Sequence, residues 1–362
     1  MKYVDEFRDG AAAARLVERI HRRPAVPVNI MEVCGTHTVA IFRHGIRQLL
    51  PEHVSLVSGP GCPVCVTANR DIDWAIALAR EPGVILATFG DMLKVPGSHS
   101  SLQQAKAEGC QVRVVYSTLD ALEIAQSHPD RSIVFFGIGF ETTAPTVACS
   151  LLEAERMGLS NYYVFSVHKV MPPPMRALVA SGETRIDGFL CPGHVSAIIG
   201  SEPYRFISRD YGIPCVVSGF EPLDILQSID MLLAMRAEGR ADVEIQYRRV
   251  VRPEGNPVAL EQLYQVFRPV DAEWRGLGVI PGSGLEIRDE YARFDARRAF
   301  QIDPGPSREQ QGCRCGDVLR GLISPPKCPL YGRACTPENP VGPCMVSSEG
   351  ACSTWFQFMG VE

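Results

Sequence analysis

The sequence lacks several features that mark nucleic-acid-binding, membrane and secreted proteins. It contains no long run of one charge sign, and 36 Lys and Arg against 41 Asp and Glu give a net charge of −5. We therefore expect no nucleic-acid partner and no membrane partner. No apolar run approaches the length of about 20 residues that spans a bilayer. The opening segment MKYVDEFRDG is charged and lacks the apolar region of a secretory signal, so we expect a cytoplasmic protein of two or three domains.

Cysteine, by contrast, is abundant, with 13 residues. Structural disulfides are rare in the reducing cytoplasm, so this number indicates metal or redox chemistry. Nearly half of the cysteines lie in one segment near the C-terminus, namely Cys313, Cys315, Cys328, Cys335, Cys344 and Cys352. The same segment is rich in proline and glycine, which contribute few backbone donors and side chains to a packed core. We expect a metal or a covalent link to hold it together.

Short apolar runs alternate with helical stretches from residue 28 onward, a pattern typical of βαβ units and a mainly parallel sheet. The runs are Val28–Val33, Val54–Val57, Val84–Ala87, Val112–Tyr116, Ile133–Phe136, Tyr162–Val167, Asp187–Leu190 and Pro214–Val217. The last four repeat the pattern of the first four about 100 residues later. We interpret this as a duplication that gives an α/β fold of two similar parallel-sheet lobes facing a central cleft. The lobes are predicted at residues 1–130, with an N-terminal helix, and 131–270; a Cys-rich C-terminal [4Fe–4S] segment follows at 271–362.

Polar and thiol side chains follow several of these predicted strands, where open α/β sheets bind their ligands. They are Cys34, His37, Cys62, Cys65, Glu141 and His194. The Cys62-Pro-Val-Cys65 spacing favours a redox or metal pair over an inert one. Cys34 alone is as consistent with a small buried residue, although His37 could polarise its thiol. Glu141, together with Thr142 and Thr143, could cap the following helix. His194 is as consistent with a structural role as with a role in a polar site.

The terminal cysteines are widely spaced. Structural zinc sites usually pair ligands two to four residues apart, and only Cys313 and Cys315 are that close. Iron–sulfur clusters take four thiolates, which would leave two cysteines for a redox-active disulfide beside the cluster. We therefore favour a [4Fe–4S] cluster, with zinc or disulfides alone as the alternatives.

Five motifs together resemble the HypD family of [NiFe]-hydrogenase maturation factors over nearly the whole chain. They are CGTHT at 34–38, GPGCPVC at 59–65, GFETTAP at 139–145, PGHVS at 192–196 and CTPENPVGPCMVSSEGAC at 335–352. The resemblance implies a scaffold on which an Fe(CN)2(CO) unit is assembled. A HypC-type chaperone would be its partner, HypE would donate cyanide, and the hydrogenase large subunit would be reached through the chaperone. Cys34 is implied to bind the iron together with the chaperone's N-terminal cysteine.

The resemblance also implies roles for the other cysteines, by similarity to ferredoxin–thioredoxin reductase. The implied cluster ligands are Cys315, Cys328, Cys335 and Cys352. Cys313 and Cys344 would form the adjacent redox pair, or Cys344 would be a ligand in place of Cys315. Electrons would then pass through Cys62 and Cys65 to the Cys34 cleft. The alternatives are a stand-alone iron–sulfur thiol–disulfide oxidoreductase and a nucleotide-binding dehydrogenase that uses residues 137–143.

Overall fold

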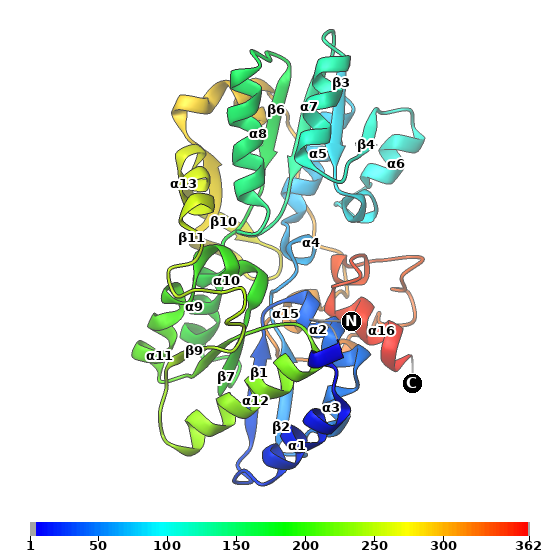
Figure 1. The fold of residues 1–362 in the computed structure, drawn as a ribbon. Helices are drawn as coiled ribbons and strands as arrows, with labels where there is room; N and C mark the ends of the chain where they lie inside the picture. The colour runs from blue at the N-terminus through cyan, green and yellow to red at the C-terminus, as the bar shows by residue number, and fades with distance from the viewer. Residues whose placement is uncertain (1–4, 361–362) are drawn as a thin grey trace.

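The computed structural model describes residues 5–360 and contains two parallel β-sheets (Figure 1). The five-stranded sheet has the order β2-β1-β7-β8-β9, and the four-stranded sheet has the order β4-β3-β5-β6. The strands of the first are β1 (Val28–Glu32), β2 (Val54–Ser58), β7 (Gly188–Pro192), β8 (Cys215–Ser218) and β9 (Val243–Ile245). Those of the second are β3 (Val84–Thr88), β4 (Val112–Val114), β5 (Ser132–Gly137) and β6 (Tyr162–Ser166). Each of the predicted apolar runs overlaps a strand, which confirms the parallel α/β class.

A lobe boundary at residue 130 would require each sheet to take its strands from one side of that boundary, and the observed pairing does not do so. β7 lies beside β1, with Ile30 opposite Gly188, and not beside β6, the preceding strand in the chain. The five-stranded sheet therefore takes strands from both predicted ranges, 1–130 and 131–270, and so does the four-stranded sheet. Periodicity along the chain identifies a strand, but its neighbour depends on long-range packing that the pattern does not contain.

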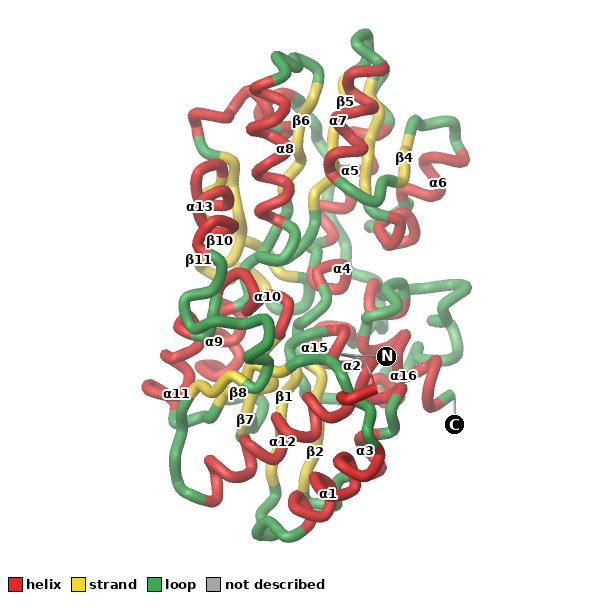
Figure 2. The backbone as a smooth tube through the Cα atoms, viewed as in Figure 1, coloured by secondary structure: helices red, strands yellow, loops and turns green. Residues whose placement is uncertain are grey.

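Helices cover the sheets on both sides of the molecule (Figures 1 and 2). The α-helices are α1 (Gly10–His21), α2 (Gly35–Arg43), α3 (Ile46–Leu49), α4 (Pro63–Val66), α5 (Asn69–Ala79), α6 (Leu102–Ala107), α7 (Thr118–Ser127), α8 (Ala144–Arg156), α9 (Pro172–Ser181), α10 (Gly193–Ile199), α11 (Arg205–Tyr211), α12 (Pro222–Ala237), α13 (Pro257–Val266), α14 (Ala296–Ala299), α15 (Cys315–Leu319) and α16 (Ala351–Met359). Short 3-10 helices lie at Asp5–Phe7, Gly90–Lys94, Glu202–Tyr204, Asp289–Phe294, Pro325–Lys327 and Pro343–Met345. None of the helices in residues 5–360 is long and apolar enough to cross a bilayer.

The buried residues form three clusters. α1 and α12 pack against the five-stranded sheet through residues such as Ile20, Ile30 and Ile229. α7 and α8 pack against the four-stranded sheet around Phe135. The third cluster contains buried residues of both parallel sheets and extends to the C-terminal cysteines, including Cys344. β3 and β7 are buried along their whole length, as expected for parallel strands that are covered on both faces.

Two connections determine where the candidate site lies. The chain leaves the five-stranded sheet at the end of β2 and enters the four-stranded sheet through residues 59–69, which include α4. After β9 and α13 it forms an antiparallel ribbon, β10 (Phe267–Trp274) and β11 (Gly278–Ile287), which crosses the boundary predicted at residue 270. The C-terminal segment then returns, and α16 packs against α2, with Trp355 and Phe42 in edge-to-face contact at 5.1 Å (Figure 1).

Candidate metal and thiol site

Cys34 lies where three distant segments of the chain meet. It is the N-cap residue of α2 and directly follows β1. The N–H of Gly35 donates to the carbonyl oxygen of Gly61 at 3.2 Å, which fixes Cys34 against the loop that precedes Cys62. On the other side, the Thr36 hydroxyl donates to Glu349 Oε1 at 2.6 Å. The glycines are needed here, because a Cβ on Gly35 would lie 2.5 Å from the carbonyl oxygen of Glu349.

The surroundings of Cys34 keep its thiol protonated. Burial raises its pKa to about 11, and the nearby Glu349 carboxylate adds to the shift, whereas the N–H groups of His37 and Thr36 oppose it. Thiolates, not thiols, bind metals. Binding of a cation by Cys34 must therefore release a proton, and affinity is expected to rise with pH.

The Cys62-Pro-Val-Cys65 pair reaches the C-terminal cysteines. Cys62 is the N-cap of α4, with Pro63 in the first turn, and Cys65 lies inside the helix with no exposed surface. α4 packs against the 3-10 helix Pro343–Met345, and the thiols of Cys344 and Cys62 act on that of Cys65. Burial raises the pKa of Cys65 well above its ordinary value. The predicted convergence of this motif with the C-terminal segment is thus present in the fold.

The six C-terminal cysteines share one apolar pocket. Its lining consists of Cys313, Cys315, Val318, Cys328, Leu330, Tyr331, Cys335, Gly342, Cys344, Met345 and Cys352. The cavity measures only about 10 Å³, so the sulfur atoms nearly fill it. Within residues 5–360, no group of three His, Cys, Asp or Glu side chains is arranged as a ready metal site. The fit to a four-thiolate cluster therefore rests on donor chemistry and on the shared lining of the pocket.

The sulfur contacts differ from the predicted pairing of Cys313 with Cys344. The Sγ atoms of Cys315 and Cys344 lie 2.7 Å apart, and the thiols of Cys352 and Cys65 also act on that of Cys344. Cys313 instead contacts Cys315. The cause is local: α15 begins at Cys315 and turns that side chain inward, whereas Cys313 precedes the helix and stays half-buried.

The predicted histidines gather near Cys34 but do not bond to its thiol. His37 Nε2 lies 3.0 Å from the carbonyl oxygen of Gly219 and 3.3 Å from that of Ser218. The rings of His37 and His194 both stack with Phe220, with centroids 4.7 and 4.0 Å from it. Burial lowers the pKa of His37 to about 4, so the ring is neutral. The backbone N–H of His37, and not its imidazole, interacts with the Cys34 thiol.

Glu141 lies apart from this group, after β5 of the four-stranded sheet. Its Oε1 accepts the N–H of Met171 at 2.9 Å, and its buried Oε2 has no protein partner. Burial raises its pKa to about 7. Because Met171 is the N-cap residue of α9, the structure groups Glu141 with the start of that helix and not with Cys34.

Two carboxylates near Cys34 were missed in the sequence. Glu349 bonds to Thr36 and lies in the SSEGAC stretch, where a lone acid among cysteines was the available signal. Glu32 is an acid inside an apolar strand and is almost completely buried. Its Oε1 accepts hydroxyl bonds from Ser58 and Thr38, and burial raises its pKa to about 8.

Comparisons with known proteins agree on one family. The model for HypD, described as the hydrogenase formation hypA family, matches residues 11–359. A hydrogenase maturation factor HypD from Azotobacter vinelandii is 50% identical over 367 residues, 99% of this chain and 97% of that protein. The HypD of Escherichia coli K12 is 47% identical over 370 residues, covering 100% and 99%. A putative hydrogenase expression/formation protein of Methanocaldococcus jannaschii is 43% identical over 344 residues, covering 95% and 94%.

Proposed function

The chain belongs to the HypD family of hydrogenase maturation factors, and we propose that it is the scaffold on which the Fe(CN)2(CO) unit of [NiFe]-hydrogenase is assembled. A HypC-type chaperone would share the iron with Cys34, HypE would supply cyanide, and the chaperone would carry the product to the large subunit in the cytoplasm. The stand-alone oxidoreductase is not favoured by these relationships.

One observation carries the proposal: thiols from three distant segments converge on a short path. Cys34 is held against the Gly61 loop, Cys65 contacts Cys344, and Cys344 contacts Cys315. Low-spin iron with cyanide and carbonyl ligands is suited to soft thiolate donors.

The sulfur contacts also lead us to revise the proposed roles in the C-terminal pocket. Cys315 and Cys344 are in contact, so we propose these two as the redox pair. Cys313, Cys328, Cys335 and Cys352 then remain as the four ligands of a [4Fe–4S] cluster, which line the same pocket. When bound, such a cluster would supply single electrons to the adjacent pair.

Electron balance explains why two dithiols are useful. Release of cyanide from a thiocyanate leaves a thiolate and consumes two electrons. Oxidation of the Cys62/Cys65 dithiol to a disulfide forms one S–S bond and releases two electrons and two protons. The dithiol Cys315/Cys344 can reduce it again by thiol–disulfide exchange, since α4, which holds Cys65, packs against the 3-10 helix that holds Cys344. The path thus runs from the C-terminal pocket through Cys65 and Cys62 toward Cys34.

The test is infrared spectroscopy of the protein purified anaerobically with its chaperone. Cyanide and carbonyl stretching bands are expected for the native chain and for Cys149→Ser, a control at an exposed cysteine. Cys62→Ala should lose hydrogenase maturation and keep its iron and sulfide content. Loss of the cluster in Cys62→Ala would show that Cys62 is a ligand, and absence of the bands from the native complex would refute the scaffold.

A further inference from the structure

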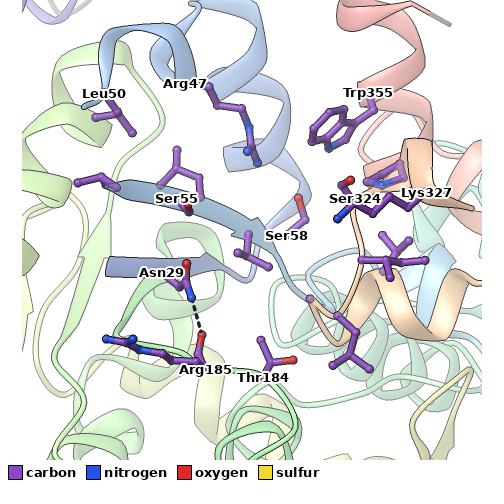
Figure 3. A pocket seen from close by; sticks show the side chains of 18 of the residues that line it. Asn29, Arg47, Leu50, Ser55, Ser58, Thr184, Arg185, Ser324, Lys327 and Trp355 are labelled. Carbon is purple, nitrogen blue, oxygen red and sulfur yellow. Dashed lines mark hydrogen bonds between the residues drawn. The ribbon is translucent and has the colours of Figure 1, made fainter. Parts of the chain in front are cut away.

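A cavity of about 760 Å³ opens beside β2, and no cysteine lines it. Its volume lies within the range of about 300–1,000 Å³ that is usual for small-molecule sites. One wall is β2, at the edge of the five-stranded sheet, with no strand on its outer side. The other walls are residues 183–185 and the C-terminal segment around residues 321–327 and Trp355 (Figure 3). The cavity therefore exists only because the C-terminal segment packs onto the sheet edge.

Arg47, on α3, is directed into this cavity toward Ser58 (Figure 3). Its guanidinium carbon lies 4.8 Å from the ring centroid of Phe42 and 5.3 Å from that of Trp355. These aromatic contacts hold the group in place without using its donors. Arginine stays protonated in proteins, although burial lowers its pKa here. A fixed positive charge therefore faces the cavity.

The donors of Arg47 have no acceptor in the described part of the chain. Its Nε is buried and makes no hydrogen bond. No carboxylate oxygen of residues 5–360 lies within 4.0 Å of a guanidinium nitrogen of Arg47, which is the limit for an ion pair. Glu32 is close enough to influence Arg47 electrostatically, but its Oε1 accepts from Ser58 and Thr38, and its Oε2 is buried without a hydrogen bond to Arg47 or any other group of residues 5–360. A buried donor without a partner costs free energy, so an acceptor from outside the chain would be stabilised here.

The same end of the cavity offers further groups suited to an anion. Lys327 and Ser324 lie across from Arg47, next to Trp355 (Figure 3). Of the two acids in the lining, Glu183 is paired with Arg320 at 2.6 Å, and Glu52 belongs to the loop before β2. Apolar side chains complete the walls, namely Leu50, Val57, Val318, Leu322 and Ile323.

We propose that this cavity binds a small molecule that carries a carboxylate or phosphate group, with Arg47 as its anchor. The planar fork of a guanidinium matches two oxygen atoms of either group. Lys327 adds a second positive charge at the mouth, and the apolar walls accept the body of the ligand. The inference depends on neither the iron nor the cluster, so it stands or falls separately from the scaffold function.

Isothermal titration calorimetry of the full chain, prepared anaerobically at constant ionic strength in chloride, tests the proposal. The probes are inorganic phosphate and succinate, and at least one is expected to bind saturably. Arg47→Met keeps a long side chain against Phe42 and Trp355 but removes the donors. Its affinity for that probe should fall about tenfold to a hundredfold, the usual loss for charge-assisted hydrogen bonds. The probe that binds identifies the oxyanion.

Arg185→Met is the matched control. Arg185 lines the same cavity, but its guanidinium is paired with Asp187 at 3.1 Å and donates to the carbonyl oxygen of Pro27. Its removal should change the affinity by less than about threefold. The proposal is overturned if neither probe binds saturably, or if the two variants lose affinity equally. If Arg47→Met does not fold, Arg47→Lys replaces it as the test variant. An unchanged affinity in folded Arg47→Lys would show that the guanidinium does not bind two oxygen atoms of the ligand, and it would also overturn the proposal.

Discussion

Replacing Gly61 with alanine would put a methyl group where the backbone of Cys34 now lies. The added Cβ would be 2.2 Å from the nitrogen of Cys34 and 2.3 Å from the carbonyl carbon of Val33. Ordinary van der Waals contact begins at 3.4 Å, so the two backbones must separate by about 1.2 Å. Neither neighbour is a flexible side-chain end that could rotate away. The separation would also break the hydrogen bond from Gly35 to the Gly61 carbonyl oxygen.

The expected cost combines two terms. Overpacking of a close contact costs about 1–3 kcal/mol, and a lost backbone hydrogen bond adds about 1 kcal/mol. We therefore expect Gly61→Ala to lower the free energy of unfolding by about 2–4 kcal/mol, measured by urea denaturation. The cyanide and carbonyl infrared bands should also be lost, because Cys34 would no longer keep its place against the crossover loop.

Gly90→Ala is the matched control. Gly90 also follows a strand, β3, and the nearest atom to its added Cβ would be Val114 Cγ1 at 3.6 Å. That substitution should leave the free energy of unfolding within about 0.5 kcal/mol of the native value. If Gly61→Ala proved as stable as Gly90→Ala and retained the bands, the close approach of the two segments would not be what positions Cys34.

Three further predictions concern buried charges. Burial raises the pKa of Glu32 from 4.5 to about 8. Between these pH values the folded state keeps a proton that the unfolded state has lost. The free energy of unfolding should therefore fall as the pH rises from about 4.5 to 8. Glu32→Gln should flatten that slope in urea titrations at several pH values; an unchanged slope contradicts the burial argument. Glu349→Gln removes the negative charge that helps raise the pKa of Cys34, so alkylation of Cys34, followed by mass spectrometry, should begin at lower pH than in the native chain. Arg249→Met should destabilise the fold by about 2 kcal/mol or more, because it leaves the fully buried Asp224 without its ion pair; an unchanged unfolding temperature in calorimetry would contradict this.

Most strands of the two parallel sheets could be predicted from the sequence because they are short apolar runs that are largely buried in the fold. β3 and β7 show this most clearly, since every residue in them is buried. The ribbon of β10 and β11 was missed because Arg268, Glu273 and the glycines of Gly278–Gly284 interrupt the apolar pattern. Its pairing depends on partners in the fold, such as the contact of Lys169 with Gly284.

The candidate site was predictable in its components and not in its contacts. The motifs identified the relevant cysteines because residues that follow parallel strands gather at one sheet edge. Which sulfurs touch depends on side-chain direction, and the start of α15 at Cys315 decides that Cys315, not Cys313, meets Cys344. Glu141 was grouped with Cys34 because both follow strands, but those strands belong to different sheets.

The order of the strands has a consequence for synthesis of the chain. The strands of the four-stranded sheet all lie between residues 84 and 166, so that sheet has all its strands while the ribosome is still at work. β1 and β2 must wait for β7, β8 and β9, which end at residue 245. Cys34 and Cys62 are made early and the segment that holds Cys344 is made last, so the thiols of this site come together only near the end of synthesis.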